Sequence, residues 1–206
     1  ADMIELGIPS SDPMADGPVI QRASERALAN NVGICQTIDL VKEFRIKNKT
    51  TPIILMGYAN PIEAIGVDNF VKLIKDAEVD GVITVDYPPE ESVDFVELLQ
   101  KNNIDSIFLL SPTTEDKRVQ LIIEQATGFI YYVSLKGVTG SSNIDIKQVT
   151  ERVGNIRKFT KMPIGVGFGV RDAKTAKEVA SFADAVVIGS KIVLEVENSK
   201  KEDLIG

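Results

Sequence analysis

The sequence contains no histidine and only one cysteine, Cys35. Without histidine, no Ser-His or Cys-His nucleophile can form, so acid–base chemistry must rest on Asp, Glu, Tyr, Lys or Cys. A lone cysteine cannot form an internal disulfide, which favours a reducing compartment, and we expect a cytoplasmic protein. The shortage of both residue types also argues against a zinc site, and we expect no bound metal.

Excess basic charge and long apolar runs are also lacking. The 206 residues include 23 Lys or Arg and 30 Asp or Glu, which gives a net charge of −7. This balance argues against sequence-independent nucleic-acid binding. No apolar run is long enough to cross a bilayer, and none has the form of a signal peptide. The hydrophobic share of 44% supports a sizeable core, and no Pro/Ser-rich linker interrupts residues 1–206, so we expect a single domain.

Short apolar runs alternate with segments of helical periodicity along the whole chain. The runs predicted as strands are 3–8, 53–56, 81–85, 106–110, 129–133, 163–166 and 185–188. The segments predicted as helices are 19–49, 62–77, 90–102, 114–125, 144–159, 172–181 and 190–197. Strict alternation predicts a parallel sheet with helices on its outer surface. Thr37 or Asp39, and Thr114, are candidate helix N-caps.

Two glycine-containing loops favour a barrel over an open sheet. Gly167-Phe168-Gly169 and Gly189-Ser190 each follow one of the last two predicted strands and precede a helix. A phosphate held by these two loops is a common feature of TIM barrels. We therefore predict a (βα)8 TIM barrel in which residues 3–8 form the second strand, so that strand 1 and helix 1 are missing from the chain as given. A doubly wound open sheet is the alternative and needs no missing piece, and each glycine pair alone also fits a tight turn.

The first predicted strand carries an acid. If residues 3–8 are extended, Ile4, Leu6 and Ile8 share one face and Glu5 lies on the other. A carboxylate between buried apolar neighbours is costly unless it is paired or protonated, so we expect a raised pKa at Glu5. The alternative is a residue at the barrel rim that forms an ion pair.

A second acid-rich segment follows directly. The loop 9–18 carries Asp12 and Asp16, so one carboxylate lies on a strand and others lie on the polar loop after it. Two different environments can separate two pKa values, which suits general acid–base catalysis. Aspartate is also common in turns for local reasons, so each of the two acids can be structural.

Three further features each allow a functional and a structural reading. Tyr131 shares a strand face with Phe129 and is either a core aromatic or the wall of a flat pocket. The loop Gly137-Val138-Thr139-Gly140 is either an ordinary surface loop or a lid that excludes water. Asp86 stands at the end of a strand, where a turn also favours aspartate.

These motifs closely resemble the tryptophan synthase α subunit family. The most specific match is the stretch Ile4-Glu5-Leu6-Gly7-Ile8-Pro9 followed by Ser11-Asp12-Pro13-Met14-Ala15-Asp16-Gly17-Pro18. Further matches are Leu55-Met56-Gly57-Tyr58-Ala59-Asn60-Pro61, Asp86-Tyr87-Pro88-Pro89-Glu90-Glu91, Gly137-Val138-Thr139-Gly140, Gly165-Val166-Gly167-Phe168-Gly169 and Gly189-Ser190. The resemblance covers nearly the whole chain in order.

The resemblance implies a (βα)8 barrel lyase of aromatic amino-acid biosynthesis. It would split indole-3-glycerol phosphate into indole and glyceraldehyde 3-phosphate by a retro-aldol cleavage, without metal or organic cofactor. By motif match, Glu5 is the acid–base group, Asp16 holds the indole N–H, and Tyr131 lies beside Glu5. The remaining matched positions are the lid residue Thr139 and the phosphate cradle of Gly140, Gly169, Gly189 and Ser190.

The resemblance also implies a partner. The α subunit pairs with a β subunit in an α2β2-type complex, and pyridoxal phosphate belongs to that β subunit. Segments 12–16, 88–89 and 134–143 are then expected at or near the interface. The sequence departs from the family pattern at Ser10, where an aromatic is usual, at Leu135, and at Phe129.

Two other functions stay open. One is a truncated, poorly active α subunit that acts mainly as a binding partner of the β subunit. The other is a different phosphate-binding barrel, such as a sugar-phosphate isomerase or epimerase, against which the acid-rich loop after the first strand argues.

Overall fold

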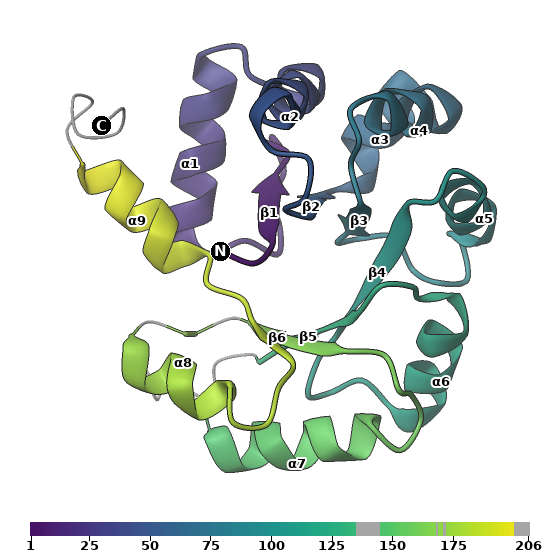
Figure 1. Cartoon of the computed structure of the whole chain (residues 1–206), viewed down its shortest axis with the longest axis vertical. Helices are drawn as coiled ribbons and strands as arrows, with labels where there is room; N and C mark the ends of the chain where they lie inside the picture. Colours follow the sequence, from purple (N-terminus) through teal and green to yellow (C-terminus); the bar gives the residue numbers. More distant parts are fainter. Residues whose placement is uncertain (135–144, 168, 171, 200–206) are drawn as a thin grey trace. The chain divides into compact units, whose positions relative to one another are not determined.

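The computed structural model describes residues 1–134, 145–167, 169–170 and 172–199, in which strands and helices alternate (Figure 1). Contacts divide the chain into two compact units. The first comprises Ala1–Asp16, Ser24–Phe108 and Gln125–Gly128, and the second comprises Gly17–Ala23, Leu109–Glu124 and Phe129–Gly206. The observed alternation confirms the expected order of elements, whereas the expected single domain stays a prediction.

The first unit is built on parallel strands. They are β1 (Ile4–Gly7), β2 (Ile53–Gly57), β3 (Gly81–Thr84) and most of β4 (Asp105–Leu110), paired in chain order. The helices are α1 (Pro18–Ala29, from Ser24 on), α2 (Ile34–Lys47), α3 (Ala59–Ile65), α4 (Val67–Asp76) and α5 (Val93–Lys101). Because all pairs are parallel, the carboxyl ends of β1 to β3, and the loops that follow them, lie at one edge of this sheet.

The core of the first unit fixes which face of β1 carries chemistry. Ile4 and Leu6 pack against a buried cluster that includes Ile38 and Val41 of α2. Since side chains alternate along a strand, Glu5 points to the opposite face. The predicted separation of Glu5 from its apolar neighbours is therefore confirmed.

The predicted helix over 19–49 is two helices. The chain leaves α1 at Asn30, and Asn31 adopts a left-handed conformation with φ of 58°, which an asparagine tolerates better than most residues. Gly33 is the N-cap of α2, so the predicted cap at Thr37 or Asp39 is wrong. Thr37 lies one turn inside the helix, where its hydroxyl donates to the Gly33 carbonyl at 2.9 Å.

Two other helix starts also differ from the prediction. The helix expected over 62–77 begins at Ala59 and is interrupted at Gly66, whose φ of 85° only glycine adopts readily. Thr114 was expected as an N-cap, but its hydroxyl accepts the Ser111 backbone N–H at 3.0 Å and closes the preceding loop instead. Local side-chain hydrogen bonds of this kind compete with capping.

The second unit repeats the parallel arrangement. It contains β5 (Ile130–Val133), β6 (Ile164–Gly167) and β7 (Ala185–Val186), again paired in chain order. Its helices are α6 (Asp116–Gln125), α7 (Ile146–Ile156), α8 (Ala173–Val179) and α9 (Ser190–Asn198). Asp145 and Asp172 cap α7 and α8 through bonds to backbone N–H groups three residues on, at 3.0 and 2.8 Å. Carboxylates at these positions also suit the helix dipole.

A buried arginine fastens the amino ends of β2 and β3. Arg45 of α2 is 4% exposed, and its guanidinium donates to Asp80 Oδ2 at 2.7 Å. It also donates to the backbone carbonyls of Glu78 and Thr51 at 2.9 and 2.8 Å. The same Asp80 oxygen accepts the backbone N–H of Ile53 at 2.7 Å, so one carboxylate links a helix to two strands.

The second unit contains the same arrangement of arginine, aspartate and strand N–H, with a more exposed arginine. Arg157 donates to Asp184 Oδ2 at 2.7 Å, and that oxygen accepts the Ile164 N–H at 2.8 Å. In both units the arginine lies at the carboxyl end of a helix, in the last turn of α2 or just after α7. The aspartate directly precedes a strand, and the N–H belongs to the first residue of the neighbouring strand. These bonds hold the pKa of Asp184 below its usual range, chiefly through the Ile164 N–H.

The two arginines give a matched stability test. We expect Arg45→Met to lower the free energy of unfolding by about 2–4 kcal/mol, because it leaves Asp80 and several backbone carbonyls without their buried donor. Arg157→Met should cost less than about 1 kcal/mol, since the Arg157 side chain is 39% exposed and water can replace it. Urea unfolding followed by circular dichroism measures both; equal losses would contradict the assignment.

Candidate active site

Glu5 lies at the middle of β1, paired with Ile54 of β2, on the face opposite the helices. Glu5 is exposed, whereas its apolar flanks predict an enclosed side chain, yet neighbouring protein atoms still remove part of the water around its carboxyl group. A carboxylate anion needs a full hydration shell, so partial loss of this water favours the protonated form of Glu5. This desolvation raises the pKa of Glu5 from 4.5 to about 7, the direction expected from the sequence.

Asp16 is half-buried in the loop between β1 and α1. Its Oδ2 accepts a hydrogen bond from the Tyr58 hydroxyl at 3.1 Å, and its N–H donates to the Pro13 carbonyl at 3.0 Å. Burial raises the pKa of Asp16 above 3.8, and the Tyr58 bond acts in the opposite direction. Asp16 is therefore partly desolvated, and the Tyr58 hydroxyl is a specific donor that favours its anion.

Tyr58 contacts Asp16, and no role of its own was predicted for it from the sequence. It follows β2 directly, is 5% exposed, and spans 42 residues of sequence to reach Asp16. Its hydroxyl also accepts the Ala15 backbone N–H at 3.1 Å. The available signal was its position after a buried strand, the same edge at which the acid-rich loop begins.

The contacts of Asp12 agree with a structural role in a turn. It is exposed, its N–H donates to Ser10 Oγ at 3.1 Å, and its carboxylate accepts from Ser11 Oγ at 2.9 Å. These are local bonds that shape a turn. Ser10 itself is 8% exposed, so its hydroxyl serves the loop backbone.

Asp86 has a defined structural partner. Its Oδ1 accepts the Ala59 backbone N–H at 2.7 Å, at the first turn of α3. Ala59 is the residue after Tyr58, so the loop after β3 holds the backbone next to the tyrosine that contacts Asp16.

In the second unit, Tyr131 of β5 is 3% exposed and lies against Gly167, the last residue of β6. A Cβ built on Gly167 would come within 2.7 Å of Tyr131 Cε2 and 2.8 Å of Cζ. Glycine at this position is therefore required by the tyrosine ring, which explains part of the Gly167-Phe168-Gly169 motif without any ligand.

The other glycines of the predicted cradle differ among themselves. Gly169 has φ of 85°, so its backbone alone requires glycine. Gly189 has no such requirement: its φ is −101°, and a Cβ there would meet no atom within 4 Å. Gly189 and Ser190 begin α9 just after β7, which pairs with β6, so the loops after both strands leave from one edge. Thr139 and Gly140 lie outside the described residues.

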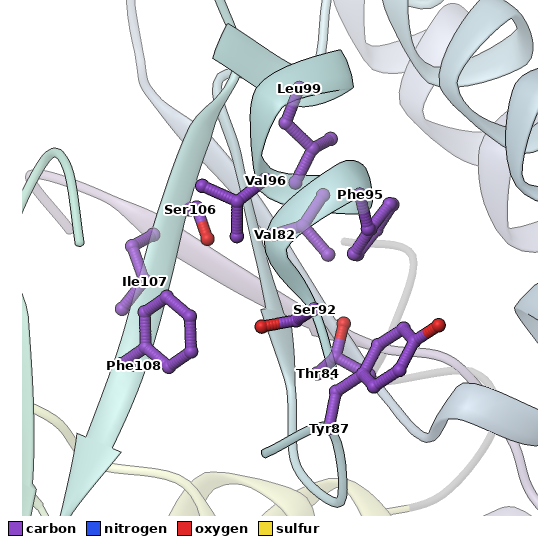
Figure 2. Close-up of a pocket in the computed structure, with 10 residues that line it drawn as sticks. All are labelled: Val82, Thr84, Tyr87, Ser92, Phe95, Val96, Leu99, Ser106, Ile107 and Phe108. Atoms are coloured by element: carbon purple, nitrogen blue, oxygen red, sulfur yellow. The ribbon is translucent and has the colours of Figure 1, made fainter. Parts of the chain in front are cut away.

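A small hollow in the first unit does not include the two acids (Figure 2). It lies between β3, β4 and α5, where side chains of Thr84, Ser92, Ser106, Phe95 and Phe108 line it. Its volume of about 10 Å³ is close to that of one water position, and it includes neither Glu5 nor Asp16. It is a packing gap between the helix and the sheet.

Over the described ranges, no group of three or more His, Cys, Asp or Glu side chains is arranged to hold a metal ion. Within the same ranges, no helix combines the length and apolarity required to span a membrane.

Comparison with known proteins agrees with this geometry. Residues 1–205 match the family model described as tryptophan synthase alpha chain. The chain is 58% identical to the tryptophan synthase alpha chain of Janthinobacterium sp. (strain Marseille), over 100% of this chain and 77% of that protein. It is 55% identical to that of Nitrosomonas europaea, over 99% of this chain and 74% of that protein.

Solved structures give the same result. The crystal structure of tryptophan synthase subunit alpha from Legionella pneumophila str. Paris matches with a TM-score of 0.89 and 41% identity, over 98% of this chain and 75% of that one. Tryptophan synthase from M. tuberculosis, in its aminoacrylate-bound form, matches with a TM-score of 0.87 and 33% identity, over 97% and 76% of the two chains. The chain thus spans about three quarters of the length of these relatives.

The alternation of parallel strands and helices agrees with these matches and places the chain in the TIM-barrel class. The acid of raised pKa on a strand and the acid-bearing loop after it agree with a lyase. The predicted barrel class is thereby confirmed over the open-sheet alternative. The chain belongs to the tryptophan synthase alpha chain family. Its role is that of an indole-3-glycerol phosphate lyase in tryptophan biosynthesis.

Proposed function

We propose that this chain splits indole-3-glycerol phosphate by a retro-aldol step in which Glu5 transfers the protons. Protonation of the ring carbon that bears the side chain places positive charge on the ring nitrogen. Loss of the proton from the neighbouring side-chain hydroxyl then breaks the carbon–carbon bond, returns the electron pair to the ring, and yields indole and glyceraldehyde 3-phosphate. The observation that carries this proposal is the raised pKa of Glu5, about 7. At that value both the acid and the base form are populated near neutral pH.

Asp16 is proposed to stabilise the positive charge that develops at the ring N–H. A carboxylate suits this role only if it stays ionised while Glu5 is protonated. Burial raises the pKa of both acids, and at Asp16 the hydrogen bond from the Tyr58 hydroxyl opposes this effect and favours the anion. The environments of the two acids therefore differ in the direction that the reaction needs.

The phosphate group is proposed to bind at the loops after β6 and β7, through Gly140, Gly169, Gly189 and Ser190. Gly189 supports this best, because neither its φ nor its packing requires glycine, and the absence of a Cβ leaves its backbone N–H open to close approach by an anion. Tyr131 is proposed to form part of the ring pocket, and Thr139 to belong to a lid that excludes water.

Membership of the family implies a β-subunit partner. We propose an α2β2-type complex in which segments 12–16, 88–89 and 134–143 lie at or near the interface. Met14 in the first segment is 81% exposed, which suits a contact surface. No organic cofactor is expected in this chain, and pyridoxal phosphate is expected in the partner.

Two acids of one loop give a matched test of the proposed role of Asp16. We expect Asp16→Asn to lower kcat for indole release from indole-3-glycerol phosphate by roughly 10²-fold, since it removes the charge that faces the developing cation. Asp12→Asn, with only local bonds, should retain nearly full activity. The absorbance or fluorescence of released indole, measured on this chain without a β subunit, gives kcat for both variants. Equal kcat values would refute the proposed role of Asp16.

A further inference from the structure

Three hydrogen bonds connect the loops after β1, β2 and β3 in the first unit. The Tyr58 hydroxyl donates to Asp16 Oδ2 and accepts the Ala15 N–H, both at 3.1 Å. The Asp86 carboxylate accepts the Ala59 N–H at 2.7 Å. No one of these bonds is local in sequence, because they span 42, 43 and 27 residues.

The middle of this chain of contacts is rigid. Tyr58 immediately follows Gly57, the end of β2, whose carbonyl accepts the Val85 N–H at 2.9 Å from the neighbouring strand end. On its other side, Ala59 is held by Asp86. The ring itself is 5% exposed, so its direction is fixed by packing as well as by its backbone.

Short-range bonds shape the loop 9–17, which carries Asp16. The Asp16 N–H donates to the Pro13 carbonyl, and the Met14 N–H donates to the Asp12 carbonyl. The Tyr58 hydroxyl contacts both the backbone of this loop, at the Ala15 N–H, and the Asp16 carboxylate, so one group bonds the loop and its acid at the same time.

We propose that Tyr58 is a positioning residue that orients the Asp16 carboxylate for the reaction, and that Asp86 supports it by fixing the backbone at Ala59. The inference rests on the proposed role of Asp16. Tyr58 acts through Asp16 and transfers no proton. Its burial and the nearby Asp16 and Asp86 carboxylates raise its pKa to about 12, so the hydroxyl remains a donor throughout the working pH range.

The variant Tyr58→Phe removes the hydroxyl and keeps the ring. We expect kcat to fall about tenfold with a smaller change in KM, because a bond to a charged acid is lost while substrate contacts remain. The matched control is Tyr132→Phe. Tyr132 is fully buried, and its hydroxyl has no hydrogen-bond partner among the described residues, so kcat should stay unchanged.

Asp86 separates a positioning role from a charge effect. Asparagine keeps the oxygen that accepts the Ala59 N–H, whereas alanine removes it. We expect Asp86→Ala to lower kcat several-fold, with Asp86→Asn close to wild type. Equal loss in both variants would show that the charge of Asp86 matters and would overturn its supporting role.

The decisive experiment titrates the Asp16 carboxyl carbon by 13C NMR in wild type, Tyr58→Phe and Tyr132→Phe, alongside indole-release kinetics. We expect the pKa of Asp16 to rise only in Tyr58→Phe, because only that variant loses the donor to its anion. An unchanged Asp16 pKa in Tyr58→Phe overturns the inference, as does an unchanged kcat in that variant while Asp16→Asn shows its expected loss. If wild type releases no indole but the Asp16 pKa still rises, the contact stands and the proposed reaction fails instead.

Discussion

Replacement of Glu5 by glutamine is expected to reduce indole release by roughly 10³-fold, within the range that a positioned general acid–base group contributes. Glutamine keeps the size of the side chain on β1 and removes its exchangeable proton. Glu43→Gln is the matched control, since Glu43 is an exposed residue of α2 and should retain full kcat. Indole formation under saturating substrate measures both, and a Glu5→Gln rate within threefold of wild type would exclude Glu5 as the proton donor.

The pH dependence of the wild type gives an independent check. If protonated Glu5 begins the reaction, kcat/KM should be highest below pH 7 and fall as the pH rises through about 7, where Glu5 loses its proton. The residual rate of Glu5→Gln should lack this alkaline fall. A wild-type profile that is flat from pH 6 to 9 would contradict the assignment.

The same group predicts a change in stability. The pKa of Glu5 is higher in the folded chain, about 7, than its ordinary value of 4.5, so the folded state holds the proton more tightly. The stabilisation that this gives is complete below pH 4.5 and is lost as the pH rises through about 7. Glu5→Gln should therefore melt at a higher temperature than wild type at pH 8. This gain would also show that its loss of activity is not a folding defect.

Gly167→Ala is expected to lower the melting temperature by roughly 2–10 °C, because overpacking of a buried site costs about 1–3 kcal/mol. The new Cβ would lie within 2.8 Å of two ring carbons of Tyr131, and both residues are buried. The ring must move, so indole release should fall as well, by about tenfold or more if Tyr131 lines the proposed ring pocket.

Two further variants isolate the clash. Gly154→Ala is the control: Gly154 lies in α7, a Cβ there meets no atom within 4 Å, and alanine favours a helix, so stability should not fall. Tyr131→Leu shortens the facing side chain. Combined with Gly167→Ala, it should recover part of the stability lost by the glycine variant alone, as a non-additive double-mutant cycle. Strict additivity would mean that the two side chains do not compete for space.

Sequence patterns predicted the parts of the fold that depend on neighbouring residues. Alternation in residues 3–8 placed Glu5 opposite Ile4 and Leu6, because side-chain direction along a strand follows the strand itself. The breaks at Asn31 and Gly66 were not predicted, since the apolar periodicity continues on both sides of a single left-handed residue.

The site was predictable only in part, for a related reason. Glu5 and Asp16 belong to one short motif, whereas the donor that defines the environment of Asp16 comes from Tyr58 on another strand. A contact over 42 residues leaves no local pattern in the chain. The glycines could not be told apart from the sequence. The Tyr131 ring explains Gly167 and a positive φ explains Gly169, whereas neither cause applies at Gly189.

The two arginine–aspartate pairs, Arg45–Asp80 and Arg157–Asp184, have a consequence for engineering. They lie at the amino edge of the strands, before β3 and β7, while every residue proposed to meet substrate follows the carboxyl end of a strand or lies within one. Randomised libraries confined to loops 9–17 and 85–92 would therefore leave both arginine–aspartate pairs intact. Such libraries can search for altered ring specificity while the contacts that stabilise each unit stay unchanged.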